Sequence, residues 1–234
     1  MVRRLAYSVS EREHWISATG GLLGTLAVLL ASQLLPGNHG NSLIIASMGA
    51  SAVLLFAAPH GALSQPWPVL GGHLVSALVG VSCARWLEGD PMLAASLAVA
   101  LSIAAMYSLR CLHPPGGATA LYAVMGGEAV HAMGYGYLLN PVLANVAVLL
   151  IVSVAFNYPF AWRRYPQAWF ASRTAKPEKA MIPHSRLVYA LSQIDTFVDI
   201  SEEDLQRIYG LAMCDDCPAA QAAAGALAAK SGRA

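Results

Sequence analysis

The feature that most constrains this chain of 234 residues is a long central block with almost no charge. From His14 to Trp162, 149 residues include five charged ones, and the remaining 22 charged residues lie outside this block. The five are Arg85, Glu88, Asp90, Arg110 and Glu128. In soluble domains about 25% of the residues are charged, whereas in this chain 12% are. The block therefore belongs in a lipid bilayer, and its charged flanks belong in water.

Composition excludes several other classes of protein. A formal net charge of +1 provides no basic surface for nucleic acid. Intrinsic disorder needs low hydrophobicity, and 56% of these residues are hydrophobic. The first apolar stretch is too long for a signal peptide, lacks a clear cleavage site and is followed by further apolar stretches. Cys83 and Cys111 lie in or beside apolar runs, where cysteine is usually a small hydrophobic residue.

Six apolar stretches separated by breakers predict an all-α, polytopic membrane protein. A bilayer core of about 30 Å needs about 20 helical residues, although shorter spans occur. The stretches are 16–35, 43–58, 69–86, 92–109, 116–139 and 141–158. The second is short and Gly126-Gly127-Glu128 interrupts the fifth, so we expect these two to be broken or re-entrant. A count of four membrane elements stays open beside the count of six.

The distribution of arginine predicts the domains and their orientation. We expect an N-terminal segment over 1–15, a transmembrane domain over 16–160 and a tail over 161–234. Six crossings put six arginines on one side and Arg85 alone on the other. The six are Arg3, Arg4, Arg12, Arg110, Arg163 and Arg164. Since arginine accumulates on the cytoplasmic side, both termini are predicted to be cytoplasmic in a bacterial-type inner membrane; four crossings give the same result.

The tail has the pattern of two short amphipathic helices. Apolar residues recur at helical spacing over 187–198, and the capping-box string 201–204 precedes a second apolar face. Two such helices bury too little surface to fold alone, so we expect them to pack on the membrane domain or on a partner. The Ala-rich end is predicted to be mobile. Cys214 and Cys217 have C-x-x-C spacing but no second ligand pair, which favours a simple turn.

Two short strings have a similar or identical counterpart in the other half of the membrane domain. Gly49-Ala50-Ser51-Ala52 resembles Gly117-Ala118-Thr119-Ala120, and Pro-Val-Leu opens both the third and the sixth stretch. Strings three elements apart cross the membrane in opposite directions. This pattern suggests a 3+3 inverted repeat with a binding site at its interrupted helices. Small residues also recur at ordinary helix contacts, so chance similarity stays open as the alternative.

The string His113-Pro114-Pro115-Gly116-Gly117 is the most specific feature of the chain. The two prolines lack amide donors and prevent a helix from continuing through them. The two glycines let the backbone approach a neighbour or a ligand. A helix that begins here has amides without internal partners and a partial positive charge. Inside a bilayer such amides must contact protein or a wet cavity, so we expect an anion site.

This string resembles that of the HPP family of integral membrane proteins. The segments 49–54 and 65–73 resemble the other recurring strings of the family, and the likeness extends over 16–160. Members in plant chloroplasts act in nitrite transport, so the resemblance implies nitrite as a substrate. Some members carry a pair of C-terminal CBS modules. The 72 residues after Trp162 are too few for that pair, so CBS-type regulation is not expected.

We therefore predict a transporter or channel for a small inorganic anion, with nitrite as the first candidate. The predicted anion-binding residues are Gly49, Ala50, Ser51, His113, Pro114, Pro115, Gly116, Gly117, Ala118 and Thr119. The residues predicted to gate or to transfer protons are His73, Arg110 and Glu128. No catalytic residue, metal ligand or cofactor is predicted. The predicted partners are the bilayer, the anion and a second copy of the chain.

Other roles stay open for several of these residues. His113 either contacts the anion, carries a proton or simply holds the turn, and Arg110 either attracts an anion or anchors the topology. One alternative function is a membrane enzyme that uses His73 and His113 as acid–base groups or metal ligands. Another is a membrane scaffold whose tail recruits a partner.

Overall fold

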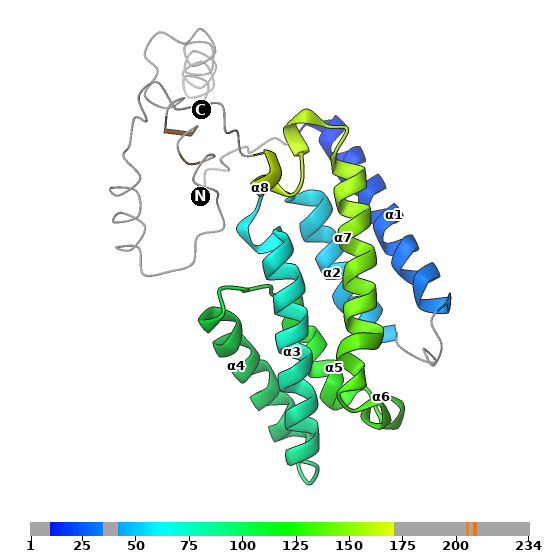
Figure 1. Ribbon diagram of the computed structural model, residues 1–234, viewed down its shortest axis with the longest axis vertical. Helices are drawn as coiled ribbons and strands as arrows, with labels where there is room; N and C mark the ends of the chain where they lie inside the picture. The colour runs from blue at the N-terminus through cyan, green and yellow to red at the C-terminus, as the bar shows by residue number, and fades with distance from the viewer. Residues whose placement is uncertain (1–9, 35–41, 171–204, 206–207, 210–234) are drawn as a thin grey trace, which may run out of the picture. The chain divides into compact units, whose positions relative to one another are not determined.

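The computed structural model describes residues 10–34, 42–170, 205, 208 and 209. The chain divides into two units, Met1–Ala171 and Ser172–Ala234. The regular elements of the described part are all helical (Figure 1), which confirms the predicted all-α class. Of the two helices predicted in the tail, only Leu205, Ile208 and Tyr209 are described, and all three are helical. The rest of the tail, with Cys214 and Cys217, lies outside the described residues, as do residues 1–9.

Seven main helices follow one another along the first unit within the described residues. They are α1 (Glu11–Leu34), α2 (Ser42–Ala57), α3 (Pro66–Trp86), α4 (Pro91–Ser108), α5 (Pro115–Met125), α6 (Glu128–Met133) and α7 (Ala144–Asn157). Short helical turns lie between and after them: η1 (Ala62–Ser64), η2 (Leu138–Leu143), η3 (Ala161–Arg163) and α8 (Gln167–Phe170). Four described segments are long and apolar enough to cross a membrane: Glu11–Gln33, Pro66–Trp86, Pro91–Ser108 and Glu128–Asn157. The chain is thus a polytopic helical membrane protein.

The two elements expected to be broken differ from each other. The break predicted in the second element is wrong, because α2 continues through Gly49 as one helix. A single glycine costs a helix only about 1 kcal/mol, which the surrounding apolar residues offset. The fifth element is divided as predicted. Its first part, α5, has 11 residues and a length of about 16 Å, half of a bilayer core.

A tight return follows α5. The short helix α6 begins after Gly127 and ends before Gly134, and both glycines have positive φ values, of 80° and 51°. Side chains other than glycine rarely adopt this conformation. The chain then passes through η2, where Asn140 is extended in front of Pro141, and continues as α7.

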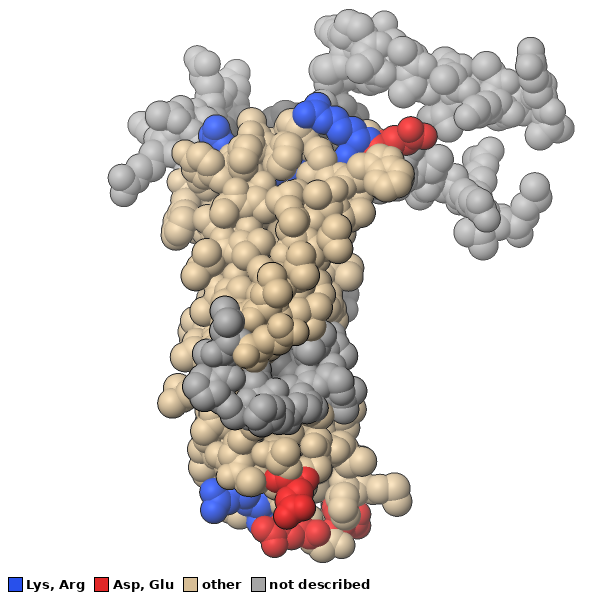
Figure 2. Space-filling view, turned by 90° about the vertical axis from the view of Figure 1, so that its right-hand side faces the viewer, with Lys and Arg blue, Asp and Glu red and all other residues tan. Residues whose placement is uncertain are grey.

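Apart from the short α6, which lies in the return between α5 and α7, successive main helices run in alternate directions, so the start of α1 and the end of α7 lie at one end of the unit (Figure 1). The indole N–H of Trp162 donates to Glu13 at 3.0 Å, which fixes this proximity. The turn between α3 and α4, with Glu88 and Asp90, lies at the opposite end. Figure 2 shows charged side chains at both ends of one face and none on the described surface between them. This is the distribution expected of a bilayer-embedded domain.

Six helices pack around the interior of the described unit. Helix α5 packs against α3, α4 and α2, and α7 packs against α1 and α2. Fully buried apolar side chains fill the space between them: Leu55, Phe56, Val69, Ala77, Val142, Val146 and Leu149. The start of α5 is enclosed by protein, since Pro115 and Gly116 are buried, as backbone at membrane depth requires.

Candidate functional site

Helix α4 ends at a defined C-terminal motif, and the loop that leads to α5 follows it. Arg110 adopts the left-handed conformation, with φ of 53°. Its amide donates to Tyr107 O at 3.1 Å, and the amide of Cys111 donates to Met106 O at 2.9 Å. These two bonds form the Schellman motif that closes many helices. The exposed Arg110 thus ends α4, and its side chain lies outside the buried site described below.

Two glycines of α3 let the next segment enter the helix bundle. A Cβ atom on Gly72 would lie 2.5 Å from His113 Cβ, and one on Gly71 would lie 2.9 Å from Cys111 Cβ. No larger residue fits at either position without displacing the loop. The segment 111–113 has no regular structure, and its residues Cys111 and His113 are buried against α3, as irregular backbone at membrane depth requires.

The start of α5 is closed by its own turn. The amide of Gly116 donates to His113 O at 2.8 Å, and the amide of Gly117 donates to Pro114 O at 3.0 Å. Pro114 and Pro115 have no amide hydrogen to offer. The expectation of unpartnered amides at this helix start is therefore wrong, because the Pro-Pro turn supplies acceptors for them. In this structure an anion site has to be built from side chains.

Four polar side chains meet where α2, α3 and α5 approach one another. Ser51 Oγ lies 2.8 Å from His73 Nε2 and 2.8 Å from His113 Nε2. His73 Nδ1 lies 2.7 Å from Thr119 Oγ1. All four side chains are fully buried. We call Ser51, His73, His113 and Thr119 the polar cluster.

The polar cluster is held at both ends. His113 Nδ1 lies 2.9 Å from Leu63 O, and Thr119 Oγ1 lies 3.2 Å from Ser47 Oγ. The phenol of Tyr137 donates to Thr119 O at 3.1 Å. Every side-chain polar atom of the cluster has a partner at hydrogen-bond distance, as buried polar groups require.

The hydrogen-bond partners decide which nitrogen of each neutral imidazole carries hydrogen. Leu63 O can only accept, so His113 Nδ1 carries the hydrogen and His113 Nε2 accepts the hydrogen of Ser51. Ser51 has no second hydrogen to give, so His73 donates to it through Nε2. His73 Nδ1 then accepts the hydroxyl hydrogen of Thr119. With both rings neutral, the donors and acceptors form one directed chain from Thr119 to His113.

The predicted site residues divide into three groups. Ser51, His113 and Thr119 come together, and they are joined by His73, which was predicted only for gating or proton transfer. Pro115 and Gly116 are buried in the packing beside them. The remaining predicted anion-binding residues are exposed or half-buried: Gly49, Ala50, Pro114, Gly117 and Ala118. Glu128, at the start of α6, is also exposed, so its side chain lies outside the buried cluster.

Several contributors were not among the sequence-predicted residues. Ser47 lies one helical turn before Ser51, a spacing that could have indicated a second hydroxyl on the same face of α2. Leu63 contributes only its carbonyl group, and no pattern of side chains reveals that. Tyr137 reaches the cluster from the helical turn directly before η2, 18 residues after Thr119.

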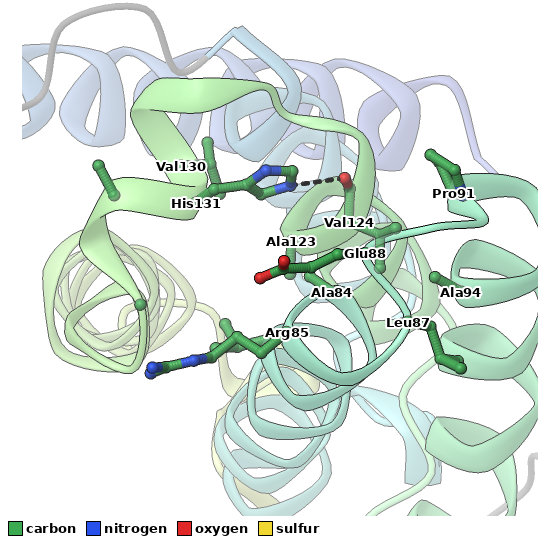
Figure 3. A pocket seen from close by; sticks show the side chains of 13 residues that line it. Ala84, Arg85, Leu87, Glu88, Pro91, Ala94, Ala123, Val124, Val130 and His131 are labelled. Atoms are coloured by element: carbon green, nitrogen blue, oxygen red, sulfur yellow. Dashed lines mark hydrogen bonds between the residues drawn. The ribbon is translucent and has the colours of Figure 1, made fainter.

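A cavity of about 530 Å³ opens at the Glu88–Asp90 end of the unit. It is bounded by α3, α4, α5 and α6, and Figure 3 shows Arg85, Glu88 and His131 around it. The ring of His131 donates through Nε2 to Val124 O at 2.8 Å. We call this cavity the vestibule. Its lining includes Ala123, one turn of α5 beyond Thr119.

The opposite end is closed around a buried guanidinium. Arg163 is 1% exposed and forms an ion pair with Glu13. It also donates to Asn157 Oδ1 at 3.2 Å, to Ser17 Oγ at 3.1 Å and to the carbonyl of Phe56. Burial lowers the pKa of Arg163 below its usual value, and the Glu13 carboxylate opposes that shift. We call Glu13, Ser17, Asn157 and Arg163 the arginine clasp; it joins α1 and α7 and binds the carbonyl of Phe56 in α2.

Known proteins relate this chain to one family. The family model described as HPP, transmembrane region, matches residues 6–166. The chain belongs to the HPP family. Two transmembrane proteins of Dictyostelium discoideum are 34% and 35% identical to this HPP protein over 160 residues, which is 67% of the chain. The matched regions make up 50% and 54% of those proteins, so this chain spans about half their length. No solved structure matches it.

Proposed function

We propose that this HPP protein moves a small inorganic anion, with nitrite as the first candidate, through the polar cluster. The observation that carries the proposal is a fully buried group of two imidazoles and two hydroxyls inside a membrane domain. Ionisable residues at membrane depth are costly, and they commonly mark the path of a substrate or a proton.

The depth of the cluster suits a transport site. Ser51 lies six residues before the end of α2, and His73 lies seven residues after the start of α3. At 1.5 Å per residue, each lies about 10 Å inside the bundle. A solute bound there would be separated from water on both sides.

The chemistry of the cluster favours an anion. Hydroxyl groups and imidazole N–H groups donate hydrogen bonds, and they can replace the water that a nitrite oxygen loses. The hydrogen bonds described for the four side chains are to hydroxyl, imidazole and carbonyl groups, and none of these partners is a carboxylate. In the closed arrangement the donors bond to one another; on binding they would turn toward the anion.

The vestibule supports an access route from one side. It ends one helical turn of α5, about 6 Å, from Thr119. The guanidinium of Arg85 gives its rim a positive charge, although Glu88 contributes an opposite one. The arginine clasp closes the other end. This arrangement corresponds to a transporter open toward the predicted outer side and closed toward the predicted cytoplasm.

The proposed inverted repeat gains support from the same geometry. Ser51 and Thr119 are the third residues of the two similar strings, and both lie within hydrogen-bond distance of His73. Their helices, α2 and α5, run in opposite directions through the unit (Figure 1). A pair of inverted halves places corresponding residues together at the centre in this way.

Nitrite uptake into proteoliposomes containing the purified full chain tests the proposal. Because nitrous acid crosses lipid unaided, protein-free liposomes give the baseline. Uptake above this baseline is expected when the protein is present. Thr119→Val should lower protein-dependent uptake. Thr19→Val is the matched control, because Thr19 is exposed and its hydroxyl donates to Trp15 O of its own helix at 2.8 Å.

Three results would contradict the transport proposal. Uptake equal to that of protein-free liposomes, for nitrite, nitrate and chloride alike, would remove it. Equal losses of nitrite uptake in Thr119→Val and Thr19→Val would show that transport does not depend on the polar cluster. A chemical change in added nitrite without uptake would favour the membrane-enzyme alternative.

A further inference from the structure

Ser51 is placed to serve two hydrogen-bond patterns that differ by one proton. Its hydroxyl has one hydrogen and three neighbours, the Nε2 atoms of His73 and His113 at 2.8 Å and Ser47 O at 3.1 Å. In the neutral pattern the hydrogen points to His113. If His113 Nε2 gains a hydrogen, it can donate to Ser51 Oγ, and the hydrogen of Ser51 then points to His73 Nε2, which has passed on its own hydrogen. Both patterns leave every member bonded.

We propose that the polar cluster relays a proton from its Thr119 side through His73 and Ser51 to His113. The resulting imidazolium balances the charge of the transported anion. This HPP protein would then be a one-to-one proton–anion symporter. The inference rests on the proposed transport function and adds to it the coupling ion and the residue that holds it.

The relay balances atom by atom. A proton arriving from the Thr119 side binds His73 Nδ1, and the hydrogen on His73 Nε2 passes to Ser51 Oγ. The original hydrogen of Ser51 passes to His113 Nε2. One proton has entered, His113 carries one positive charge, and His73 and Ser51 are neutral again. Thr119, which no longer donates to His73, can donate to Ser47 Oγ at 3.2 Å.

Charge compensation explains why a proton would accompany the anion. An unpaired anion in a buried site is costly. Three arginines of the described helices and loops lie elsewhere: Arg163 belongs to the arginine clasp, Arg85 to the vestibule, and Arg110 is exposed. The two imidazoles are the groups inside the cluster that can become cationic near neutral pH, once the charge of a bound anion offsets the burial that opposes their protonation.

Other titratable groups around the cluster are neutral at that pH. The thiol of Cys111 lies against Gly71 of α3. The phenol of Tyr137, before η2, donates to Thr119 O, and Tyr122 of α5 packs near Tyr137. From α2 and η1 the contacts are the hydroxyl of Ser47 and the carbonyl of Leu63. Thiols and phenols ionise above neutral pH, so the imidazoles are left as the proton acceptors.

A coupled flux measurement tests the symport directly. Proteoliposomes with the full chain contain a pH-sensitive dye, and potassium with valinomycin holds the membrane voltage at zero. A gradient of sodium nitrite should acidify the lumen with about one proton per nitrite after subtraction of protein-free liposomes. One bound proton per anion also predicts a pH dependence. At pH values above the pKa of the group that binds the proton, the apparent affinity for nitrite should fall about tenfold per pH unit.

Matched variants assign the coupling to the histidines. His113→Gln keeps a donor and an acceptor but cannot become cationic, so the nitrite flux that remains should carry no protons and should respond to voltage. His73→Gln should also break the relay. His14→Gln, at the exposed start of α1, should leave the ratio at one. A ratio of zero in the unmodified protein, or full coupling in His113→Gln, would overturn symport and leave anion transport standing.

Nitrogen-15 NMR of histidine-labelled protein in lipid separates this failure from a failure of transport. Without nitrite, the relay predicts an Nδ1–H tautomer for His113 and an Nε2–H tautomer for His73. When sodium nitrite is added, it predicts an imidazolium signal at His113 and an Nδ1–H tautomer at His73. If no anion is transported but this imidazolium forms, the proton site stands and the transport proposal fails. If the spectra do not respond to nitrite, the proposed proton site is overturned.

Discussion

The polar cluster and the arginine clasp bury polar groups in opposite ways. In the clasp, the permanent cation Arg163 is paired with a carboxylate. Its remaining N–H groups donate to fixed acceptors, including the carbonyl of Phe56. The cluster has no formal charge when its imidazoles are neutral, and Ser51 can point its single hydrogen in more than one direction. The clasp is therefore suited to hold helices together, whereas the cluster is suited to change its hydrogen-bond pattern.

The largest loss of stability should follow a break in the clasp. Arg163→Gln leaves Glu13 without its cation and Phe56 O with a weaker donor, so the free energy of unfolding should fall by about 3–5 kcal/mol. Arg164→Gln is the matched control, because Arg164 is exposed over the ring of Phe170, and it should change stability by at most about 0.5 kcal/mol. Thermal unfolding in detergent measures both. Equal effects of the two changes would show that the clasp does not stabilise the fold.

A smaller loss should follow when the packing beside the cluster is overfilled. A Cβ atom on Gly116 would lie 2.8 Å from Gly72 O and from Ser76 Oγ. Gly116→Ala should therefore cost about 1–3 kcal/mol. At Gly117 the nearest atom, Val99 Cγ1, would be 4.0 Å away, so Gly117→Ala should be neutral or stabilise by about 0.4–1 kcal/mol. The reverse order of unfolding temperatures would contradict the observed approach of α5 to α3.

The smallest effect should come from one neutral hydrogen bond at the edge of the cluster. Tyr137→Phe removes the bond to Thr119 O and should cost about 0.5–1.5 kcal/mol. Tyr135→Phe removes a more exposed contact with Ser82 Oγ at 3.2 Å and should cost less. Denaturant unfolding of the two variants gives the comparison. A loss at Tyr137 as large as that at the clasp would remove the energetic contrast between the two regions.

Local chemistry made much of the fold predictable. Breakers such as Pro36-Gly37 and Glu88–Pro91 separate the apolar stretches, and the Pro-Pro dipeptide forces α5 to begin as a new helix. The half-length of α5 follows from Gly126-Gly127. Gly49 misled the prediction because a lone glycine in an apolar helix resembles a break in sequence although it costs little.

The candidate site was harder to predict, because its contacts join distant parts of the chain. Ser51 and His113 are 62 residues apart, and their contact depends on the glycine pair of α3 that admits the loop. The sequence did indicate Ser51, His113 and Thr119. It could not show that the amides of Gly116 and Gly117 are satisfied within the turn, since this depends on the backbone conformation at Pro114.

The most direct test of the central claim is nitrite flux per folded molecule for Ser51→Ala against Ser96→Ala. Ser51 joins His73 to His113, so its loss should abolish protein-dependent flux while the clasp and the fold remain. Ser96 is exposed on α4 and donates to Met92 O, so its loss should leave flux unchanged. Undiminished flux in correctly folded Ser51→Ala would show that the anion does not pass through the polar cluster.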